Sequence, residues 1–155
     1  SISTLDMELK LTQLYVNLEQ LQFDNGFEFR LINNIKTPPA HITAPTMFLQ
    51  LFVENAIIHG LKHTTEEKPI LTLSMDETER EYIFRVSDNG PGYETKAAIG
   101  NHKSVGLDML RERLNCQSEL YNGDIEFNIY QSEEIKNDIR TTVTISFGKT
   151  LSIPI

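Results

Sequence analysis

The stretch Asp88-Asn89-Gly90-Pro91-Gly92 places a carboxylate and two glycines directly after a strand-like segment. The residues before it, Tyr82 to Val86, alternate between apolar and polar side chains, which predicts a half-buried strand. Asp88 can accept two hydrogen bonds in a fixed direction, and Gly90 and Gly92 carry no Cβ atom that would keep a flat ligand away. The same residues also form ordinary turns. The stretch predicts the floor of a pocket if other segments supply partners for it.

Residues 47–60, MFLQLFVENAIIHG, supply candidate partners. This segment is apolar almost all round, so we expect a buried helix. A buried amide or carboxylate without a hydrogen bond costs a few kcal/mol. Glu54, Asn55 and His59 therefore satisfy one another and the backbone, or they face a ligand. Asn55 and His59 are one helical turn apart and lie on the same side.

A first helix is predicted over residues 4–22, where Met7, Leu11, Leu14, Leu18 and Leu21 recur at spacings of four, three, four and three. This is an amphipathic pattern with a coiled-coil-like seam. Two interpretations remain open: the helix packs on its own domain, or it continues from a dimerising segment upstream.

The remaining elements alternate between strands and helices. A strand is expected over residues 27–32, after a break at Gly26, and a helix from Pro45 and Thr46 to a stop at Gly60. A hairpin over 69–75 and 81–87 follows, then a lid over 93–103 and a helix over 105–120 with Ser104 as its N-cap. The last two strands are expected over 124–130 and 141–147, joined by a charged connection from Ser132 to Asp138. Hairpins within an alternating chain predict an α/β, two-layer fold, in which helices cover one face of a mixed sheet.

Composition excludes several classes of protein. A net charge of -8 and a pI near 5.0 argue against a nucleic-acid partner, which needs a cationic face. The most apolar stretch, residues 47–53, is far shorter than the ~20 residues that span a bilayer. The single cysteine, Cys116, fits a reducing compartment, so we expect the chain to be cytoplasmic. P-loop, dinucleotide and nucleophile-elbow motifs are missing, and we do not expect His59 and His63 to form a zinc pair, because Gly60 lies between them.

Four motifs in this order resemble the ATP-binding domain of sensor histidine kinases, and within it the subfamily typified by the LytS and YehU sensors: Glu54-Asn55-Ala56-x-x-His59-Gly60, Asp88-Asn89-Gly90-Pro91-Gly92, Val105-Gly106-Leu107 and Arg111-Glu112-Arg113-Leu114. The resemblance runs from Leu5 to Phe147. The wider superfamily contains gyrase, Hsp90, histidine kinases and MutL. Each motif alone is common, but the ordered set is specific. The resemblance implies a Bergerat-type ATP-binding fold with a mostly antiparallel sheet.

The resemblance also implies roles for individual residues. Asn55 would hold Mg²⁺ through its side-chain oxygen, Asp88 would accept a hydrogen bond from the adenine amino group of ATP, and Thr141 would support Asp88 through a water. Glu54 either helps to orient the metal's water or the phosphoacceptor, or it pairs inside the core. The other expected nucleotide-binding positions are His59, Gly90, Gly92, Lys103, Ser104, Gly106 and Leu107. Backbone N–H groups at a helix start suit phosphate. The lid cations Lys96, His102 and Lys103 could also offset phosphate charge, but simple exposure is the preferred explanation for them.

Four positions depart from the family pattern. Leu51 stands where many members have an acid or asparagine, Ser104 replaces a glycine, Met109 replaces an asparagine, and Arg140 replaces the glycine before the late threonine. Leu51, Ser104 and Met109 keep open a catalytically inactive nucleotide-binding module. A second alternative is a serine kinase of the anti-sigma type with the same fold, which the seam over residues 4–22 disfavours.

The resemblance divides the chain into a helix over 1–24, an ATP-binding kinase domain over 25–150 and a tail over 151–155. None of the four histidines stands in an acceptor-like context, so the phosphoacceptor histidine is expected upstream of Ser1. The fragment should bind Mg-ATP without phosphorylating itself. The full-length protein is expected to be a homodimer, anchored in the inner membrane by segments absent here, with a response regulator receiver domain as its partner.

Overall fold

The computed structural model describes residues 2–93 and 106–149. In this part of the chain the strands form a five-stranded sheet and a separate two-stranded one. The large sheet contains β2 (Glu28–Asn33), β4 (Ile70–Glu77), β5 (Glu81–Asp88), β6 (Glu126–Lys136) and β7 (Ile139–Gly148) in the order β2-β4-β5-β7-β6. Only β2 and β4 are parallel, and the other neighbouring pairs are antiparallel. The predicted mixed, mostly antiparallel sheet is confirmed.

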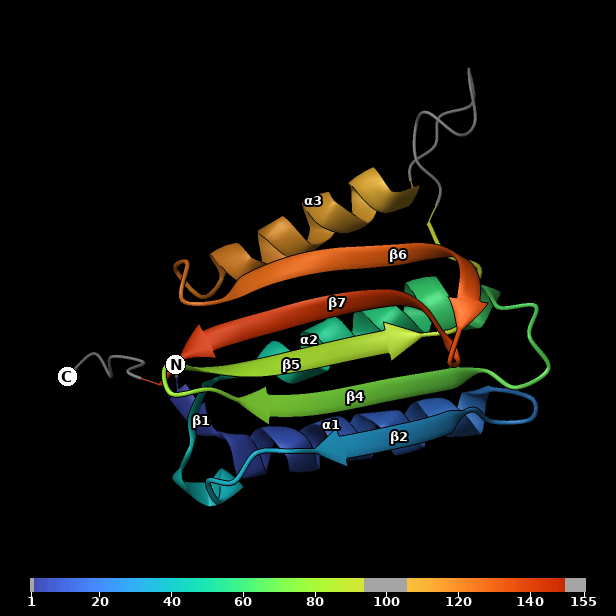
Figure 1. Cartoon of the computed structure of the whole chain (residues 1–155). Helices are drawn as coiled ribbons and strands as arrows, with labels where there is room; N and C mark the ends of the chain where they lie inside the picture. Colours follow the sequence, from blue (N-terminus) through green and yellow to red (C-terminus); the bar gives the residue numbers. More distant parts are fainter. Residues whose placement is uncertain (1, 94–105, 150–155) are drawn as a thin grey trace.

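In Figure 1, α1 (Leu5–Gln22) and α2 (Phe48–Asn55) lie behind this sheet, and α3 (Gly106–Glu119) is drawn beside β6. The sheet side that faces them is apolar, and the core forms between the two layers. Phe48 of α2 makes edge-on contacts with Phe84 of β5 and Phe147 of β7, with ring centroids 5.0 and 5.2 Å apart. The structure confirms the expected two-layer α/β sandwich.

The second helix differs from its predicted bounds at both ends. Pro45 belongs to the short strand β3 (Thr43–Pro45), and α2 begins only after Met47, whose φ is +67°. Gly60 does not stop the helical path, which continues through a π-helical turn (Ala56–Gly60) and a 3-10 turn (Leu61–His63). We expected a stop because glycine often ends helices. Here its lack of a side chain serves a close contact that is described below.

The last hairpin is also tighter than predicted. Strand β6 runs through most of the charged connection to Lys136, and Asn137 and Asp138 form the turn with φ values of +52° and +64°. Two positive φ angles are typical of a type I′ turn, and asparagine and aspartate tolerate them. An irregular register between Gln131 and Lys136 accommodates the extra residues.

Helix α1 confirms the predicted helix but turns its seam away from the domain. It begins at Leu5, where the Thr4 side chain accepts a hydrogen bond from the Met7 N–H group. Strand β1 (Ile2–Thr4) precedes it and pairs with β3, so the helix does not extend upstream through these residues. The buried side chains of α1 are Leu5, Glu8, Thr12 and Val16. The leucine-rich seam is therefore not the face that packs on this domain.

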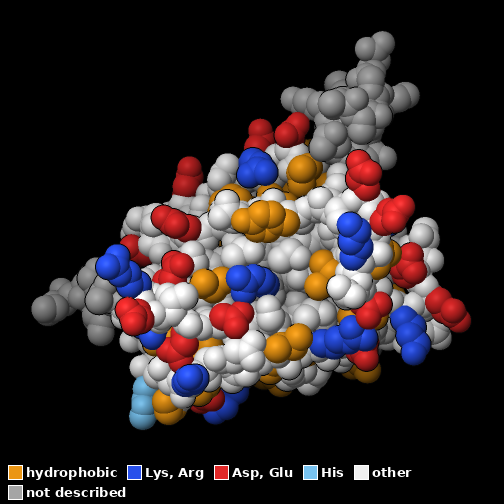
Figure 2. Space-filling model, viewed as in Figure 1, with side chains coloured by type: hydrophobic (Ala, Val, Ile, Leu, Met, Phe, Trp, Pro, Cys, Tyr) orange, Lys and Arg blue, Asp and Glu red, His pale blue; other side chains and the backbone are white. Residues whose placement is uncertain are grey.

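The sheet face opposite the helices is polar. The Ser87 and Thr142 hydroxyls of β5 and β7 share a hydrogen bond of 2.9 Å, and Arg85 forms an ion pair of 2.8 Å with Asp76 of β4. Figure 2 shows acidic and basic side chains mixed over this face. No described helix is long and apolar enough to cross a membrane.

Candidate functional site

Asp88 lies at the end of β5, directly opposite Thr141 in the antiparallel pair with β7. Its carboxyl group is buried and accepts a 2.9 Å hydrogen bond from the Gly90 N–H group. A Cβ atom on Gly60 would lie 2.8–2.9 Å from the carboxyl atoms of Asp88, and one on Gly90 would lie 2.6 Å from the Gly60 carbonyl oxygen. The two glycines therefore let the helical segment and the strand end close around the carboxyl group.

This crowding gives a first prediction. Gly60→Ala should lower the free energy of unfolding by roughly 1–3 kcal/mol, because the new methyl group meets the Asp88 carboxyl group in an already packed interior. Urea denaturation measures the change. Gly148→Ala is the matched control, since its Cβ would make only an ordinary 3.8 Å contact with the Arg80 carbonyl oxygen. Equal losses of stability in the two variants would contradict the close packing of Gly60 against the Asp88 carboxyl group.

The environment of Asp88 favours its protonated form. Burial raises the pKa of the carboxyl group to about 7, although the Gly90 hydrogen bond and the Arg140 charge oppose this shift. A hydrogen-bond donor from a ligand would therefore stabilise the ionised form of the Asp88 carboxyl group.

The Thr141 hydroxyl is the second polar group at this end of the sheet. Thr141 is 2% exposed, and its Oγ1 atom has no hydrogen-bond partner in the described part of the chain. Buried hydroxyl groups are usually satisfied, so this one fits a bound water or ligand. The structure places Thr141 opposite Asp88 in the β5–β7 pair, and its support of Asp88 through a water stays a prediction.

Arg140 and Gln131 contact the segment that follows Asp88, at Gly92 and Tyr93. A Cβ atom on Gly92, whose φ is +79°, would lie 2.7 Å from Cδ of Arg140. The Arg140 guanidinium donates to the Glu133 carbonyl oxygen, and its Nε atom has no partner among the described residues. Gln131 accepts from the Tyr93 N–H group and donates to the Tyr93 carbonyl oxygen. The departure at Arg140 thus packs against the second glycine of the motif.

Asn55 is buried on α2, and its neighbours fix the orientation of its amide. Its Nδ2 atom donates to the Leu51 carbonyl oxygen at 3.1 Å and to Oε1 of Gln117 on α3 at 2.5 Å. Two acceptors identify this atom as the nitrogen, so the other atom is the oxygen. Neither of these two hydrogen bonds uses that oxygen. Asn55 therefore has one hard oxygen ligand to offer to a cation.

The donor set fits Mg²⁺ held together with a phosphate ligand. Mg²⁺ takes few protein oxygens and keeps waters or substrate phosphates. No group of three or more His, Cys, Asp or Glu residues that could hold a metal occurs in the described part. One oxygen of Asn55 fits the first arrangement and not an all-protein metal cage.

The pKa shifts of Tyr93 and His59 link Asp88 to the helical segment that carries Asn55. The Asp88 charge and burial raise the pKa of Tyr93, while Arg113 of α3 lowers it. Burial, Arg113 and His63 lower the pKa of His59. The charge of Asp88 thus acts on Tyr93, and the charge of Arg113 acts on both Tyr93 and His59.

Glu54 faces a different neighbour from Asn55. Its charge contributes to the raised pKa of Tyr15 on α1, whereas Asn55 contacts Gln117 on α3. Leu51 accepts the Asn55 hydrogen bond through its backbone, which any residue type could do. The structure does not bring Glu54 and Asn55 to one point.

Part of the predicted phosphate end of the site lies outside the described residues. This holds for the expected N-cap Ser104, for Lys103 and for the other two lid cations, Lys96 and His102. Gly106 and Leu107 form the first turn of α3, and Met109 is exposed on it.

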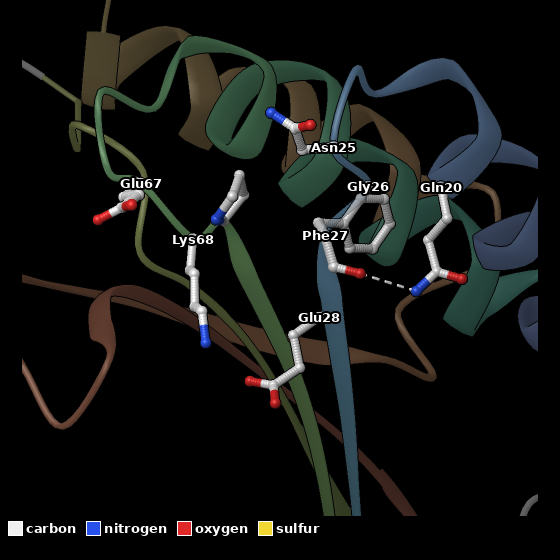
Figure 3. Close-up of a pocket in the computed structure, with 8 residues that line it drawn as sticks. Gln20, Asn25, Gly26, Phe27, Glu28, Glu67 and Lys68 are labelled. Carbon is white, nitrogen blue, oxygen red and sulfur yellow. Dashed lines mark hydrogen bonds between the residues drawn. The ribbon is translucent and has the colours of Figure 1, made fainter.

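A separate hollow of about 530 Å³ lies between the end of α1, the start of β2 and the segment before β4. Figure 3 shows Gln20 donating to the Phe27 carbonyl oxygen on one side and Glu67 and Lys68 on the other. None of the predicted site residues lines it.

Sequence comparison gives an uncharacterised relative and several LytS sensor proteins. No family model matches the chain. Protein YwpD of Bacillus subtilis is 32% identical over 127 residues, which cover 77% of this chain and 45% of YwpD. The sensor protein LytS of Bacillus cereus is 31% identical over 123 residues, covering 71% of the chain and 20% of LytS. The sensor histidine kinase/phosphatase LytS of Staphylococcus aureus is 30% identical over 89 residues, covering 57% and 15%. The chain spans less than half the length of these relatives.

Solved structures agree on the fold. The catalytic domain of histidine kinase ThkA matches with a TM-score of 0.63 and 10% identity, covering 96% of this chain and 95% of that domain. The chain is a LytS-like histidine kinase domain. Full-length ShkA in complex with AMPPNP matches with a TM-score of 0.59 and 17% identity, covering all of this chain and 33% of ShkA. At these identities the structures show the fold of the LytS-like domain alone.

In this LytS-like domain, three residues contact the predicted site or its neighbour Tyr93 although no role was predicted for them there. Gln117, Gln131 and Arg140 touch Asn55, Tyr93 and Gly92 respectively. Arg140 was noticed only as a departure from the family pattern. No local sequence pattern identifies Gln117 or Gln131, because their hydrogen-bond partners are 62 and 38 residues away in the chain.

Proposed function

We propose that this domain binds Mg-ATP and presents the γ-phosphate to a histidine outside residues 1–155. One observation carries the proposal: the buried Asp88 carboxyl group lies opposite the Thr141 hydroxyl, which has no hydrogen-bond partner among the described residues. Gly60 and Gly90 pack against this carboxyl group so closely that a side chain on either would collide with it. Such a carboxyl group can accept the amino group of a purine and is poorly served by the protein alone.

In this proposal each residue has a limited task. Asp88 accepts the adenine amino group, Thr141 holds a water beside it, and Gly90 and Gly92 leave room for the flat base. Asn55 offers its amide oxygen to Mg²⁺, which would neutralise charge on the triphosphate. Arg113, beside Tyr93 and His59, adds a positive charge on a chain of net charge -8.

The transfer itself needs positioning more than covalent chemistry. Phosphoryl transfer depends largely on alignment and charge neutralisation. The proposed whole protein would be a homodimer that contributes the acceptor histidine upstream and passes the phosphoryl group to an aspartate of a response regulator. The sensor histidine kinase LytS of Staphylococcus aureus, a relative of this chain, supports this assignment.

Calorimetry with Mg-ATP tests the proposal. The fragment should bind Mg-ATP, and incubation with γ-labelled ATP should leave the fragment itself unlabelled. A longer chain that includes the upstream segment should become labelled. A fragment that binds no nucleotide at millimolar concentration would overturn the proposal and favour an inactive module. Labelling of an added protein on serine would favour the serine kinase.

Gln117 provides a prediction on the metal. Gln117→Leu should reduce the gain in ATP affinity that Mg²⁺ provides by roughly tenfold, because only the Leu51 carbonyl oxygen then holds the Asn55 amide in its orientation. Affinity for ATP in EDTA should stay unchanged. Gln117→Glu is the matched control, since it keeps an acceptor oxygen for Nδ2 of Asn55. A Leu variant with full Mg²⁺ dependence would show that Gln117 has no positioning role.

A further inference from the structure

Arg140 is a cationic side chain at the base end of the site, and it has no task in the proposed function. It directly precedes Thr141 near the start of β7, and Figure 1 shows this part of β7 beside the end of β5. Its charge acts on the Asp88 carboxyl group, since it opposes the rise in the pKa of that group. Glycine is usual at this position in the family pattern, so the pattern assigns no role to a side chain here.

The end of the β5–β7 pairing lets the Arg140 side chain approach the segment after Asp88. The pairing ends at Asp88 and Thr141, so Arg140 lies one residue beyond it and has no β5 residue beside it. Its Cδ atom would lie 2.7 Å from a Cβ atom on Gly92, so its stem occupies the space that this glycine leaves. The Nε atom is bonded to Cδ and therefore also lies close to Gly92.

A second contact holds the far end of the Arg140 side chain. Its Nη1 atom donates a 2.7 Å hydrogen bond to the Glu133 carbonyl oxygen on β6. The stem is thus held against Gly92 and the guanidinium group against β6. The Nε atom lies between these two contacts and has a defined place at the edge of the site.

The Nε–H group of Arg140 is a donor without an acceptor. The atom is buried and has no hydrogen-bond partner in the described part of the chain. The next residue, Thr141, has a buried Oγ1 atom in the same condition. Buried polar atoms are normally paired, and an unpaired donor on a charged group is especially costly. Two such atoms on adjacent residues therefore point to a ligand at this end of the sheet.

The chemistry of Asp88 and Arg140 defines what they would recognise together. A carboxylate accepts from N–H groups, whereas the Arg140 Nε–H group needs an acceptor. Adenine offers both along one edge, because its amino group lies between the ring nitrogens N1 and N7, which are acceptors. Guanine carries an oxygen in place of this amino group, so it offers Asp88 no donor there.

We propose that Arg140 donates its Nε–H group to the ring nitrogen beside the adenine amino group that Asp88 holds. The inference rests on the proposed function, because it concerns the same bound base. A hydrogen bond from a charged donor is stronger than one between neutral groups. The side chain is held at both ends before the base arrives, so binding orders it little further. Arg140 is then a residue that selects the base, and a glycine at this position could not supply the contact.

Titration calorimetry of the 155-residue chain with ATP, 1-deaza-ATP and 7-deaza-ATP tests the contact. Each analogue replaces one ring nitrogen by a C–H group, so it lacks one acceptor and keeps the amino group. The analogue that lacks the nitrogen facing Arg140 should bind roughly tenfold more weakly than ATP. Equal affinities for all three nucleotides would overturn the role of Arg140 and leave the proposed function intact. A chain that binds none of them overturns both.

Two substitutions separate the hydrogen bond from the charge. Arg140→Gln keeps an N–H donor at the ε position without the charge, so it should still bind the sensitive analogue more weakly than ATP. Arg140→Lys keeps the charge and the stem but has a CH₂ group at the ε position. It should bind ATP and that analogue with equal affinity. A wild-type preference for ATP in Arg140→Lys would show that another group contacts this nitrogen, and it would overturn the proposal.

Arg80→Lys is the matched control for these variants. Arg80 is exposed in the turn between β4 and β5, at the opposite end of β5 from Asp88. The substitution should leave the affinity for all three nucleotides unchanged. Urea denaturation checks that both Arg140 variants are folded, so that a changed preference between ATP and its analogue reports on the contact with the base. An equal change of preference in Arg80→Lys would contradict a local role of Arg140.

Discussion

Asp88→Asn is expected to weaken Mg-ATP binding by roughly five- to 150-fold. The buried carboxylate can accept the adenine amino group and the Gly90 N–H group at the same time. Asparagine has one acceptor oxygen, so one of these two donors then faces the amide NH₂ group. A buried donor without a partner costs ~1–3 kcal/mol, which corresponds to a five- to 150-fold loss. The loss should be similar with and without Mg²⁺, because Asp88 contacts the base end of the ligand.

Titration calorimetry with ATP and with GTP measures this effect. GTP has a carbonyl oxygen where ATP has the amino group, so wild-type protein should prefer ATP and Asp88→Asn should lose most of that preference. Asp124→Asn is the matched control, because Asp124 is exposed in the turn before β6. Unchanged ATP affinity in Asp88→Asn would contradict the proposed base contact, even if the fragment binds nucleotide elsewhere.

The elements that hold this site could be predicted because their signals are local. Alternation along residues 82–86 identified β5, although its pairing with β7, which sets Thr141 opposite Asp88, came only from the structure. The apolar character of residues 47–60 predicted a buried helix, and its polar residues were recognised as needing partners. Helix α3 ends at Glu119, within one residue of the predicted end, and a turn with positive φ values at Asn122 and Gly123 follows it.

The features that the sequence did not reveal depend on contacts between distant segments. Gly60 looked like a helix stop, because its contact with the Asp88 carboxyl group involves a residue 28 positions away. The periodicity of α1 identified its apolar stripe correctly. A periodic stripe shows that a face is suited to burial but does not identify the partner that buries it. The domain instead buries Glu8 and Thr12, whose spacing from Leu5 and Val16 is equally helical.

The stability of the unliganded protein should fall as pH rises from about 4 to 7, through the titration of Asp88. The pKa of this carboxyl group is about 7 in the folded protein, against 3.8 for an unperturbed aspartate. Between these two values the unfolded chain has lost the proton that the folded protein still holds. Stability therefore decreases by up to ~1.4 kcal/mol per pH unit, a total of at most about 4 kcal/mol. The favourable contribution is complete below pH 3.8 and lost above pH 7.

Comparison with Asp88→Asn isolates this contribution from other titrating groups. Burial also raises the pKa of Glu8, and hydrogen bonds from Lys149 and from the Thr37 and Lys36 backbone lower that of Glu77 to about 2. Both carboxylates are present in the variant, so their contributions cancel in the difference. Urea denaturation at intervals from pH 4 to 8 should show the variant gaining stability relative to wild type as pH rises, with a plateau above about 7. A constant difference across this range would show that the Asp88 carboxyl group titrates at an ordinary pKa and is not held in a dry site.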